Sequence, residues 1–222
     1  MRLILVVLMS FFMLKGFAQQ ELVQGGTITS VVLGTLSIEV DDTKEIKGSP
    51  YYLSDFIYAD ISNSPKPYRM RYNVYLDEME YEIDGVLYNL DREQHDIVNF
   101  KEIQKKYVAK NYKGNKLFFI ELVDGKNYSL YKKEHIVFKE ATEAKTSFDI
   151  PTPATYKQEK NEFFIQSKEG ELIAIPRSKR KFLEFLNESE VKSVDNFIKK
   201  NKISLNEERD LIILFGHLNQ LN

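Results

Sequence analysis

The sequence predicts an α+β fold, in which a curved antiparallel β-meander (a half-barrel or roll) is followed by a C-terminal bundle of three short helices. From about residue 27 to residue 175, short runs rich in Val, Ile, Tyr and Phe alternate with dipeptides that turn β-hairpins. From residue 178 onward, apolar residues recur at helical spacing instead. The expected division of the 222 residues is a signal peptide at 1–18, an antiparallel β domain at 19–150, and a last β-hairpin with helices packing on the sheet at 151–222.

Turn residues mark the expected hairpins, at Asp84-Gly85, Gly114-Asn115, Asp124-Gly125 and Glu169-Gly170. Proline interrupts the strand pattern at 64–67 and again at 151–153, because proline cannot donate a hydrogen bond to a β-ladder. We expect the second interruption to be a linker between the main meander and the last hairpin. The hairpin at Glu169-Gly170 allows more than one register.

The register of the hairpin around Asp84-Gly85 follows from its apolar pattern. The glutamates at 78, 80 and 82 share one face, and a one-residue slip would place them against the core. We expect this face to be the solvated outer face of the sheet rather than a metal site, because calcium sites need several oxygens that converge. The predicted pairs on the core face are Ile83 with Val86, Tyr81 with Tyr88, and Met79 with Leu90.

Two irregularities of the backbone are also expected. Apolar and aromatic residues occupy the even positions from 68 to 76 but the odd positions from 79 to 83. This change of phase requires a bulge or a bend at Asp77-Glu78. For Asp124-Gly125-Lys126 we expect a three-residue loop with the glycine in the left-handed conformation. That loop aligns Ile120 with Leu130.

The C-terminal region contains three apolar stripes at helical spacing, around residues 182–186, 191–198 and 211–218. Ser178 is placed to cap the first helix, and the second helix should end at Asn201-Lys202. Ser204, with Glu207 three residues later, resembles a capping box at the start of the third helix.

The N-terminus has the layout of a secretory signal peptide. A positive start at Met1-Arg2 precedes an apolar run from Leu3 to Leu14, and Gly16-Phe17-Ala18 then supplies small residues before a cleavage site between Ala18 and Gln19. The apolar run is too short to cross a membrane as a helix, which needs about 20 residues. We therefore expect an exported protein, periplasmic or extracellular, whose mature chain has no transmembrane segment.

The composition excludes several classes of function. The chain has 31 Lys and Arg against 33 Asp and Glu, so no excess of charge favours nucleic acid as a partner. The absence of cysteine excludes disulfides, thiolate metal sites and cysteine nucleophiles. His95, His135 and His217 belong to no catalytic or metal-binding motif, so we expect them to be structural or on the surface. We expect no catalytic residue, no metal and no cofactor, and interpret the basic cluster at 177–181 as a solvated helix face.

Tyrosine is concentrated early in the sheet region, and its ring offers a binding surface a large apolar area with one polar tip. Tyr51 and Tyr52 are adjacent, so in an extended segment one of them must point away from the core. We expect that tyrosine to line an open groove with Arg69 or Arg71 nearby. These four residues are the candidates for binding a ligand or a partner.

Three segments resemble a family of exported proteins of Bacteroidota-type bacteria: GSPYYLSDF (48–56), RYNVYLDEMEYE (71–82) and FIKKNKISLNEERDLIILF (197–215). In that family a GSPY block precedes an RYNxYxDEMEF strand, and a KKNK helix pair ends the chain. This chain has Tyr81 where the family usually has Phe. The resemblance implies export, but it assigns no activity and no catalytic residue.

The sequence thus predicts an exported, non-enzymatic protein of the cell envelope or the medium that binds a partner, such as an envelope protein, or an apolar ligand. One alternative is a periplasmic carrier of a lipid or other apolar ligand, which would need a large apolar cavity rather than a filled core. Another is a cell-envelope hydrolase that uses unmarked carboxylate or Ser residues. A hydrolase of this kind would show facing carboxylates in a cleft, with raised pKa values.

Overall fold

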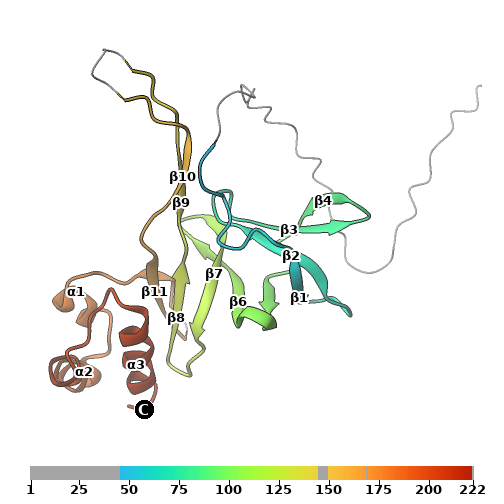
Figure 1. The fold of residues 1–222 in the computed structure, drawn as a ribbon. Coiled ribbons are helices and arrows are strands. Elements are labelled where there is room, and N and C mark those ends of the chain that lie inside the picture. The colour runs from blue at the N-terminus through green and yellow to red at the C-terminus, as the bar shows by residue number, and fades with distance from the viewer. Residues whose placement is uncertain (1–45, 145–149, 169, 222) are drawn as a thin grey trace, which may run out of the picture.

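The computed structural model describes residues 46–144, 150–168 and 170–221. The expected signal peptide, and its cleavage site between Ala18 and Gln19, lie outside these residues. The described chain forms an open ten-stranded antiparallel sheet, a separate two-stranded arm and three short helices (Figure 1). This architecture confirms the predicted α+β fold of a curved meander followed by helices.

The secondary structure elements follow one another closely along the chain. The strands are β1 (Ile57–Ile61), β2 (Tyr68–Asn73), β3 (Glu78–Ile83), β4 (Val86–Asn89), β5 (Ile97–Phe100), β6 (Lys105–Tyr112), β7 (Asn115–Val123), β8 (Tyr128–Lys133), β9 (Ile136–Lys139), β10 (Thr155–Gln158), β11 (Glu162–Ser167) and β12 (Ile173–Ala174). The helices are a single 3₁₀ turn, η1 (Lys101–Ile103), and α1 (Lys179–Leu183), α2 (Glu188–Asn201) and α3 (Glu208–Leu218).

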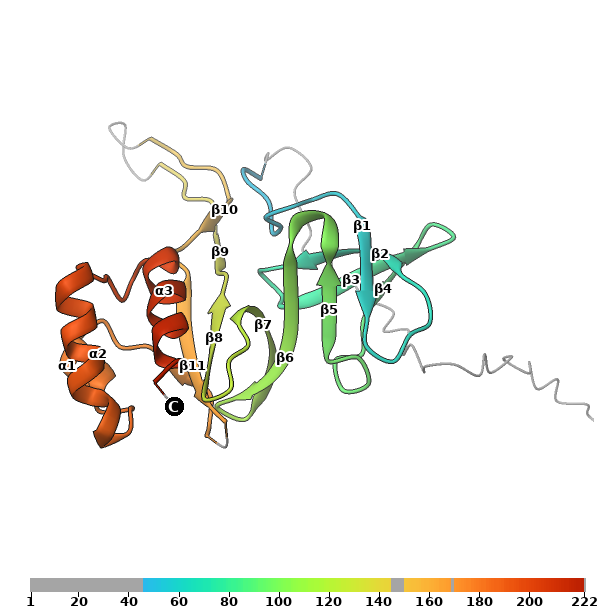
Figure 2. The ribbon, with the colours of Figure 1, turned by 90° about the horizontal axis from the view of Figure 1, so that it is seen from below.

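The order of strands across the large sheet is β12-β11-β8-β7-β6-β5-β1-β2-β3-β4. The helices lie beside β8 and β11 at one end, and β1 to β4 form the other end (Figures 1 and 2). Because β8 pairs with β11, strands from before and after residue 150 belong to the same sheet.

Apolar side chains cover both faces of the middle of the sheet. Phe118 and Phe119 are consecutive residues of β7 that point to opposite faces, and each is 1% exposed. Phe118 belongs to a core with Met70 and Met79 on the face formed by β1 to β7. Phe119 belongs to a second cluster with Val108, Tyr131, Phe164 and Leu172. A third cluster packs the helices against β8 and β11.

The predicted register of the β3–β4 hairpin is confirmed, since Ile83 pairs with Val86 and Tyr81 with Tyr88. The placement of the first pair on the core face is wrong, because Ile83 and Val86, next to the turn, are 39% and 50% exposed. The turn residues, Asp84 and Gly85, both have positive φ values (51° and 79°), as a type I′ turn requires. The irregularity expected at Asp77-Glu78 is larger than a bulge or bend. It is the end of a turn at residues 74–77 that joins β2 to β3 as a hairpin, with φ of 57° at Asp77.

Two other turn predictions were wrong in detail. The β6–β7 turn is centred on Lys113-Gly114, one residue earlier than predicted. In the β7–β8 hairpin, Ile120 lies opposite Lys132 rather than Leu130, because a bulge between residues 121 and 123 shifts the register.

A contact between distant parts of the chain explains the β7–β8 loop. The Asn219 side chain accepts the backbone N–H groups of Asn127 and Tyr128, both at 3.0 Å, and donates to the Tyr128 carbonyl at 2.8 Å. Gly125 does not have a left-handed backbone; it leaves room for Asn219, because a Cβ atom there would lie 2.1 Å from the amide nitrogen.

Strands β9 and β10 form the two-stranded arm that projects from the sheet (Figure 1). Farther along the arm, Thr142 and Thr152 exchange two backbone hydrogen bonds of 2.9 Å. The linker predicted at Pro151-Thr152-Pro153 is therefore wrong, since these residues form the returning side of the arm. Thr152 supplies the N–H group that its two proline neighbours lack.

The predicted helices are present, but their caps differ from the prediction. Ser178 is the N-cap residue of α1, although its hydroxyl makes no capping hydrogen bond. The capping box lies at α2, where Asn187 N–H donates to the Glu190 carboxylate at 3.2 Å, and not at Ser204 and Glu207. The predicted end of the middle helix is confirmed, since α2 ends at Asn201 and Lys202 follows in the left-handed conformation.

Candidate functional site

The candidate tyrosines lie in the segment 47–56, which packs against β2, β3 and β10. Backbone hydrogen bonds of 2.9 and 2.8 Å join Lys47 to residues 154 and 156, and Tyr51 forms an isolated bridge with Asn73. Tyr51 contacts Arg71, whereas Tyr52 lies in a pocket with Tyr72. Since residues 71 and 72 of β2 point to opposite faces, the two tyrosines are divided between the two faces of the sheet.

Tyr51 belongs to a hydrogen-bonded cluster around the Glu80 carboxylate. This carboxylate accepts the Tyr51 hydroxyl at 2.9 Å, Nε of Arg71 at 2.7 Å and Nδ2 of Asn73 at 2.9 Å. The Arg71 guanidinium lies 4.1 Å from the ring centroid of Tyr51 and 4.4 Å from that of Phe56, within cation–π range. Burial and the neighbouring carboxylate raise the pKa of Tyr51, so its hydroxyl stays protonated and donates.

The cluster corrects the expectation that the glutamates of β3 form a solvated face. Glu82 is exposed and Glu78 is half-buried beside Arg92, but Glu80 is only 3% exposed. Alternation along β3 indicates only that these carboxylates share a face. The segment 47–56 folds over the middle of that face and buries Glu80, a contact that strand periodicity does not reveal.

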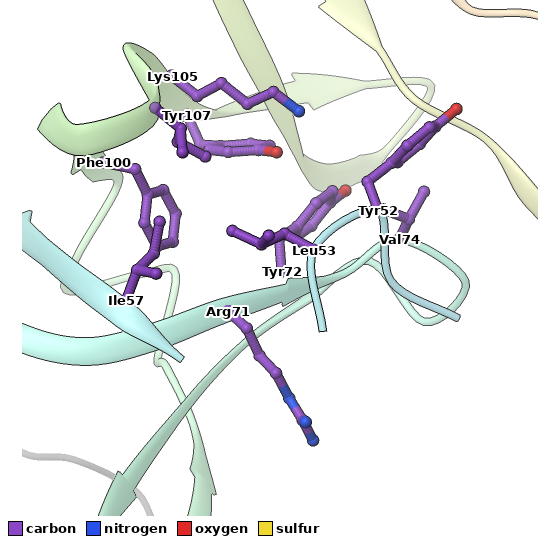
Figure 3. Close-up of a pocket in the computed structure, with 10 residues that line it drawn as sticks. Tyr52, Leu53, Ile57, Arg71, Tyr72, Val74, Phe100, Lys105 and Tyr107 are labelled. Atoms are coloured by element: carbon purple, nitrogen blue, oxygen red, sulfur yellow. The ribbon is translucent and has the colours of Figure 1, made fainter. Parts of the chain in front are cut away.

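Tyr52 lines a small pocket on the opposite face (Figure 3). The free volume of this pocket is about 20 Å³, roughly the space of one water molecule. Figure 3 shows the Arg71 side chain pointing away from the rings that surround the pocket. The lining residues are Tyr52, Leu53, Ile57, Arg71, Tyr72, Val74, Phe100, Ile103, Lys105 and Tyr107.

Lys105 provides positive charge beside the pocket. Its Nζ atom lies 2.7 Å from Oε1 of Glu134 and 5.5 Å from the centroid of the Tyr52 ring. The other oxygen of Glu134 accepts the Tyr107 hydroxyl at 3.2 Å. Burial, and secondarily Glu134, raises the pKa of both Tyr52 and Tyr107, so both phenols stay neutral.

Arg69 lies apart from this pocket. It is exposed, shares the outer face of β2 with Arg71, and has one long contact of 3.5 Å from Nη2 to the Phe56 carbonyl. The structure therefore brings Tyr51 and Arg71 together on one face, places Tyr52 on the other, and leaves Arg69 outside both groups.

A second polar cluster, which sequence reasoning missed, surrounds Asp77. Lys133 donates to the Asp77 carboxylate, to the Tyr72 hydroxyl at 2.9 Å and to the Phe118 carbonyl at 2.8 Å, which uses all three of its N–H groups. Arg92 donates to the same carboxylate at 2.8 Å. Burial lowers the pKa of Lys133, although Asp77 opposes this effect. The sequence feature that could have indicated this cluster is the charged run at 132–134, which directly follows the apolar part of the same strand.

These ionisable groups are engaged with one another rather than directed into a cleft. Among the described residues, no three His, Cys, Asp or Glu side chains are grouped as a metal site would require. His95 is buried, and its Nδ1 atom lies 2.6 Å from the Ser62 carbonyl. The arrangement holds loops and strands together, which is a structural role.

No helix in the described part of the chain has the length and apolar character to cross a membrane. Comparison of the chain with models of protein families, with curated protein sequences and with solved structures gives no match.

Proposed function

We propose that this chain is an exported, non-enzymatic binding module that binds an envelope protein at the mouth of the Tyr52 pocket. The observation that carries the proposal is an exposed apolar rim above a buried aromatic floor. Leu53 and Ile103 are 39% and 37% exposed, while Phe100 and Tyr107 beneath them are buried. Exposed apolar side chains grouped beside buried aromatic rings are typical of surfaces that pack against an apolar residue of a protein partner.

The size of the pocket favours a protein partner over an acyl chain. About 20 Å³ is far below the volume of small-molecule sites, which is on the order of 300–1,000 Å³. An apolar side chain that covers Leu53 and Ile103 would bury their exposed surface without entering the core.

The hydrogen bonding of three carboxylates favours binding over hydrolysis. Glu80, Glu134 and Asp77 each accept hydrogen bonds from a cation and from at least one neutral donor. A general acid or base must instead be able to reach its substrate. Export is proposed from the first 18 residues of the chain, whose pattern is that of a signal peptide.

Site-specific photo-crosslinking in the native host tests the proposal. A photoreactive phenylalanine analogue at Leu53 or Ile103 should give one discrete crosslinked product that contains a second envelope protein. The matched control position is Tyr58 on β1, which is 64% exposed and does not line the pocket. Equal crosslinking from all three positions, or none from positions 53 and 103, would overturn the proposed surface.

A charge substitution tests whether the apolar rim itself matters. Leu53→Asp should keep the melting temperature within a few degrees, because the side chain is exposed, and should abolish crosslinking from position 103. Tyr51 is unsuitable for this test, since its removal takes a donor from buried Glu80 and destabilises the fold. Undiminished crosslinking in Leu53→Asp would contradict the proposal.

A further inference from the structure

A second recess, of about 490 Å³, opens beside the turn between β6 and β7. Its volume is within the range of small-molecule sites. The turn itself has the geometry of a type I′ turn, because Lys113 and Gly114 both have positive φ values, 50° and 83°. The side of the recess across from the turn comes from β11 and the segment that follows it, through Gln166, Glu171 and Leu172.

The charge in this recess is positive, although the chain as a whole is not. Lys110, Lys113 and Lys116 line it against a single carboxylate, Glu171, in a chain with a formal net charge of −2. Lys116 is paired with Glu93 at 3.0 Å. Lys110 and Lys113 have no carboxylate within ion-pair distance in the described part of the chain. Two ammonium groups are therefore available to an anion.

Both of these lysines lie beside aromatic rings. Nζ of Lys113 lies 5.0 Å from the centroid of the Tyr112 ring, and Nζ of Lys110 lies 5.2 Å from that of Tyr131. Tyr112 is half-buried, and its ring packs nearly perpendicular to Phe164 at 5.1 Å. This packing orders the ring before any ligand binds, which lowers the entropic cost of binding.

An amide completes the set of groups. Gln166 uses its Nε2 atom to donate to the Gly170 carbonyl at 3.2 Å, which fixes the side chain and leaves the amide oxygen to accept from a hydroxyl. A sugar acid needs these same partners: an aromatic surface for the ring, cations for the carboxylate, and an amide for the hydroxyls.

We infer that this recess binds an anionic saccharide, with Lys110 and Lys113 holding its carboxylate and Tyr112 beside the sugar ring. The site is independent of the protein-binding surface proposed at Tyr52. Inorganic anions share the negative charge of such a ligand but lack its ring and hydroxyls. Comparing the binding of an inorganic anion with that of a sugar acid therefore distinguishes a general anion site from a saccharide site.

Isothermal titration calorimetry on the mature full-length chain tests this inference, with tetragalacturonate as the probe. Tetragalacturonate should bind, and neutral maltotetraose and inorganic phosphate should bind at least about tenfold more weakly. The double variant Lys110→Gln, Lys113→Gln should lower the affinity for tetragalacturonate about tenfold or more, and high salt should weaken wild-type binding. Lys126→Gln, an exposed lysine of the β7–β8 loop outside the recess, should leave the affinity unchanged.

Each contrary result would overturn the inference. An absence of tetragalacturonate binding would remove the site, and an equal loss in Lys126→Gln would mean that the protein responds only to its overall charge. Phosphate binding as tight as that of tetragalacturonate would leave an anion site without saccharide recognition. The double variant changes a partly exposed side chain of β6 and an exposed one of the turn that follows. An unchanged melting temperature would show that its loss of binding is not a loss of fold.

Discussion

Tyr81 and Tyr128 are both buried tyrosines of the large sheet, but their hydroxyl groups have opposite surroundings. The Tyr128 hydroxyl donates to the Glu190 carboxylate at 2.7 Å and accepts from Asn187 at 3.1 Å. The Tyr81 hydroxyl has no hydrogen-bond partner among the described residues, although its ring stacks on Tyr88 at 5.4 Å. A buried hydroxyl without a partner costs stability, whereas one that donates to a carboxylate contributes it.

The two hydroxyls therefore predict opposite effects of the same substitution. Tyr81→Phe should raise the free energy of unfolding by about 1 kcal/mol, because it removes an unsatisfied polar atom and keeps the ring. Tyr128→Phe should lower it by roughly 1.5–3 kcal/mol, since Glu190 loses a donor in a buried site. Urea denaturation of both variants measures the two values. A loss of stability in Tyr81→Phe would show that its hydroxyl does have a partner.

At the scale of elements, helix α3 holds the helical end of the molecule together. Leu211, Leu214, Phe215 and Leu218 are all fully buried, in the cluster that packs the helices against β8 and β11. Just after the helix, Asn219 makes the three hydrogen bonds that order the β7–β8 loop. The helix thus stabilises both the apolar core and a distant hairpin.

Deletion of residues 204–222 should give insoluble protein, because it uncovers the apolar faces of α2 and β8 and removes Asn219. A chain that lacks only residues 220–222 keeps α3 and Asn219 and should remain soluble. Solubility after expression and the cooperativity of thermal unfolding measure the result. If the longer truncation folds cooperatively, α3 is an appendage rather than part of the core.

At the scale of the whole molecule, the fold raises the pKa of seven tyrosines spread over the sheet and its covering segments. Burial is the first cause for each, and it raises the pKa of Tyr128 to about 12. A phenol whose pKa is raised by folding stabilises the folded state, and this stabilisation is complete below the unfolded pKa of about 10. It is lost as the pH rises through the pKa of the folded state. The seven are Tyr51, Tyr52, Tyr72, Tyr81, Tyr107, Tyr128 and Tyr156.

The midpoint of urea denaturation should therefore fall steeply above about pH 10, where the unfolded chain releases phenolic protons and the folded chain keeps them. Lys133 acts in the opposite direction, because burial lowers its pKa, but it is a single group against seven. Denaturation curves at increasing pH, with tyrosinate absorbance as a second signal, measure the effect. A midpoint that is constant up to about pH 11 would contradict the burial of these hydroxyls.

The proposed export also concerns the whole chain, and it predicts a mature N-terminus at Gln19. Intact-mass analysis of protein purified from the native host measures this directly. The expected mass is that of residues 19–222. Recovery of a chain that retains Met1 or Arg2 would remove the argument for export.

Much of the fold follows from local features of the sequence. Turn residues and two-residue alternation act over a few positions, so the register of the β3–β4 hairpin and the end of α2 could be predicted from the residues themselves. Alternation over residues 68–76 also predicts a core face, and Met70, Tyr72 and Val74 on it are buried, but Leu76 lies in the turn after β2 and is 47% exposed. Tyr51 and Tyr52 were predicted to point in opposite directions for the same reason.

Contacts between residues far apart in the sequence were decided only by the tertiary structure. Lys133 reaches Asp77 across 56 positions, Asn219 reaches Tyr128 across 91, and Tyr51 covers Glu80 across 29. No periodicity connects such residues, because each side chain finds its partner only when the sheet has curved and the covering segments have packed. Local patterns in the sequence thus determined most strands, the helices and their apolar faces. The tertiary structure decided which charges are buried, how the β7–β8 loop is shaped, and where the recesses open.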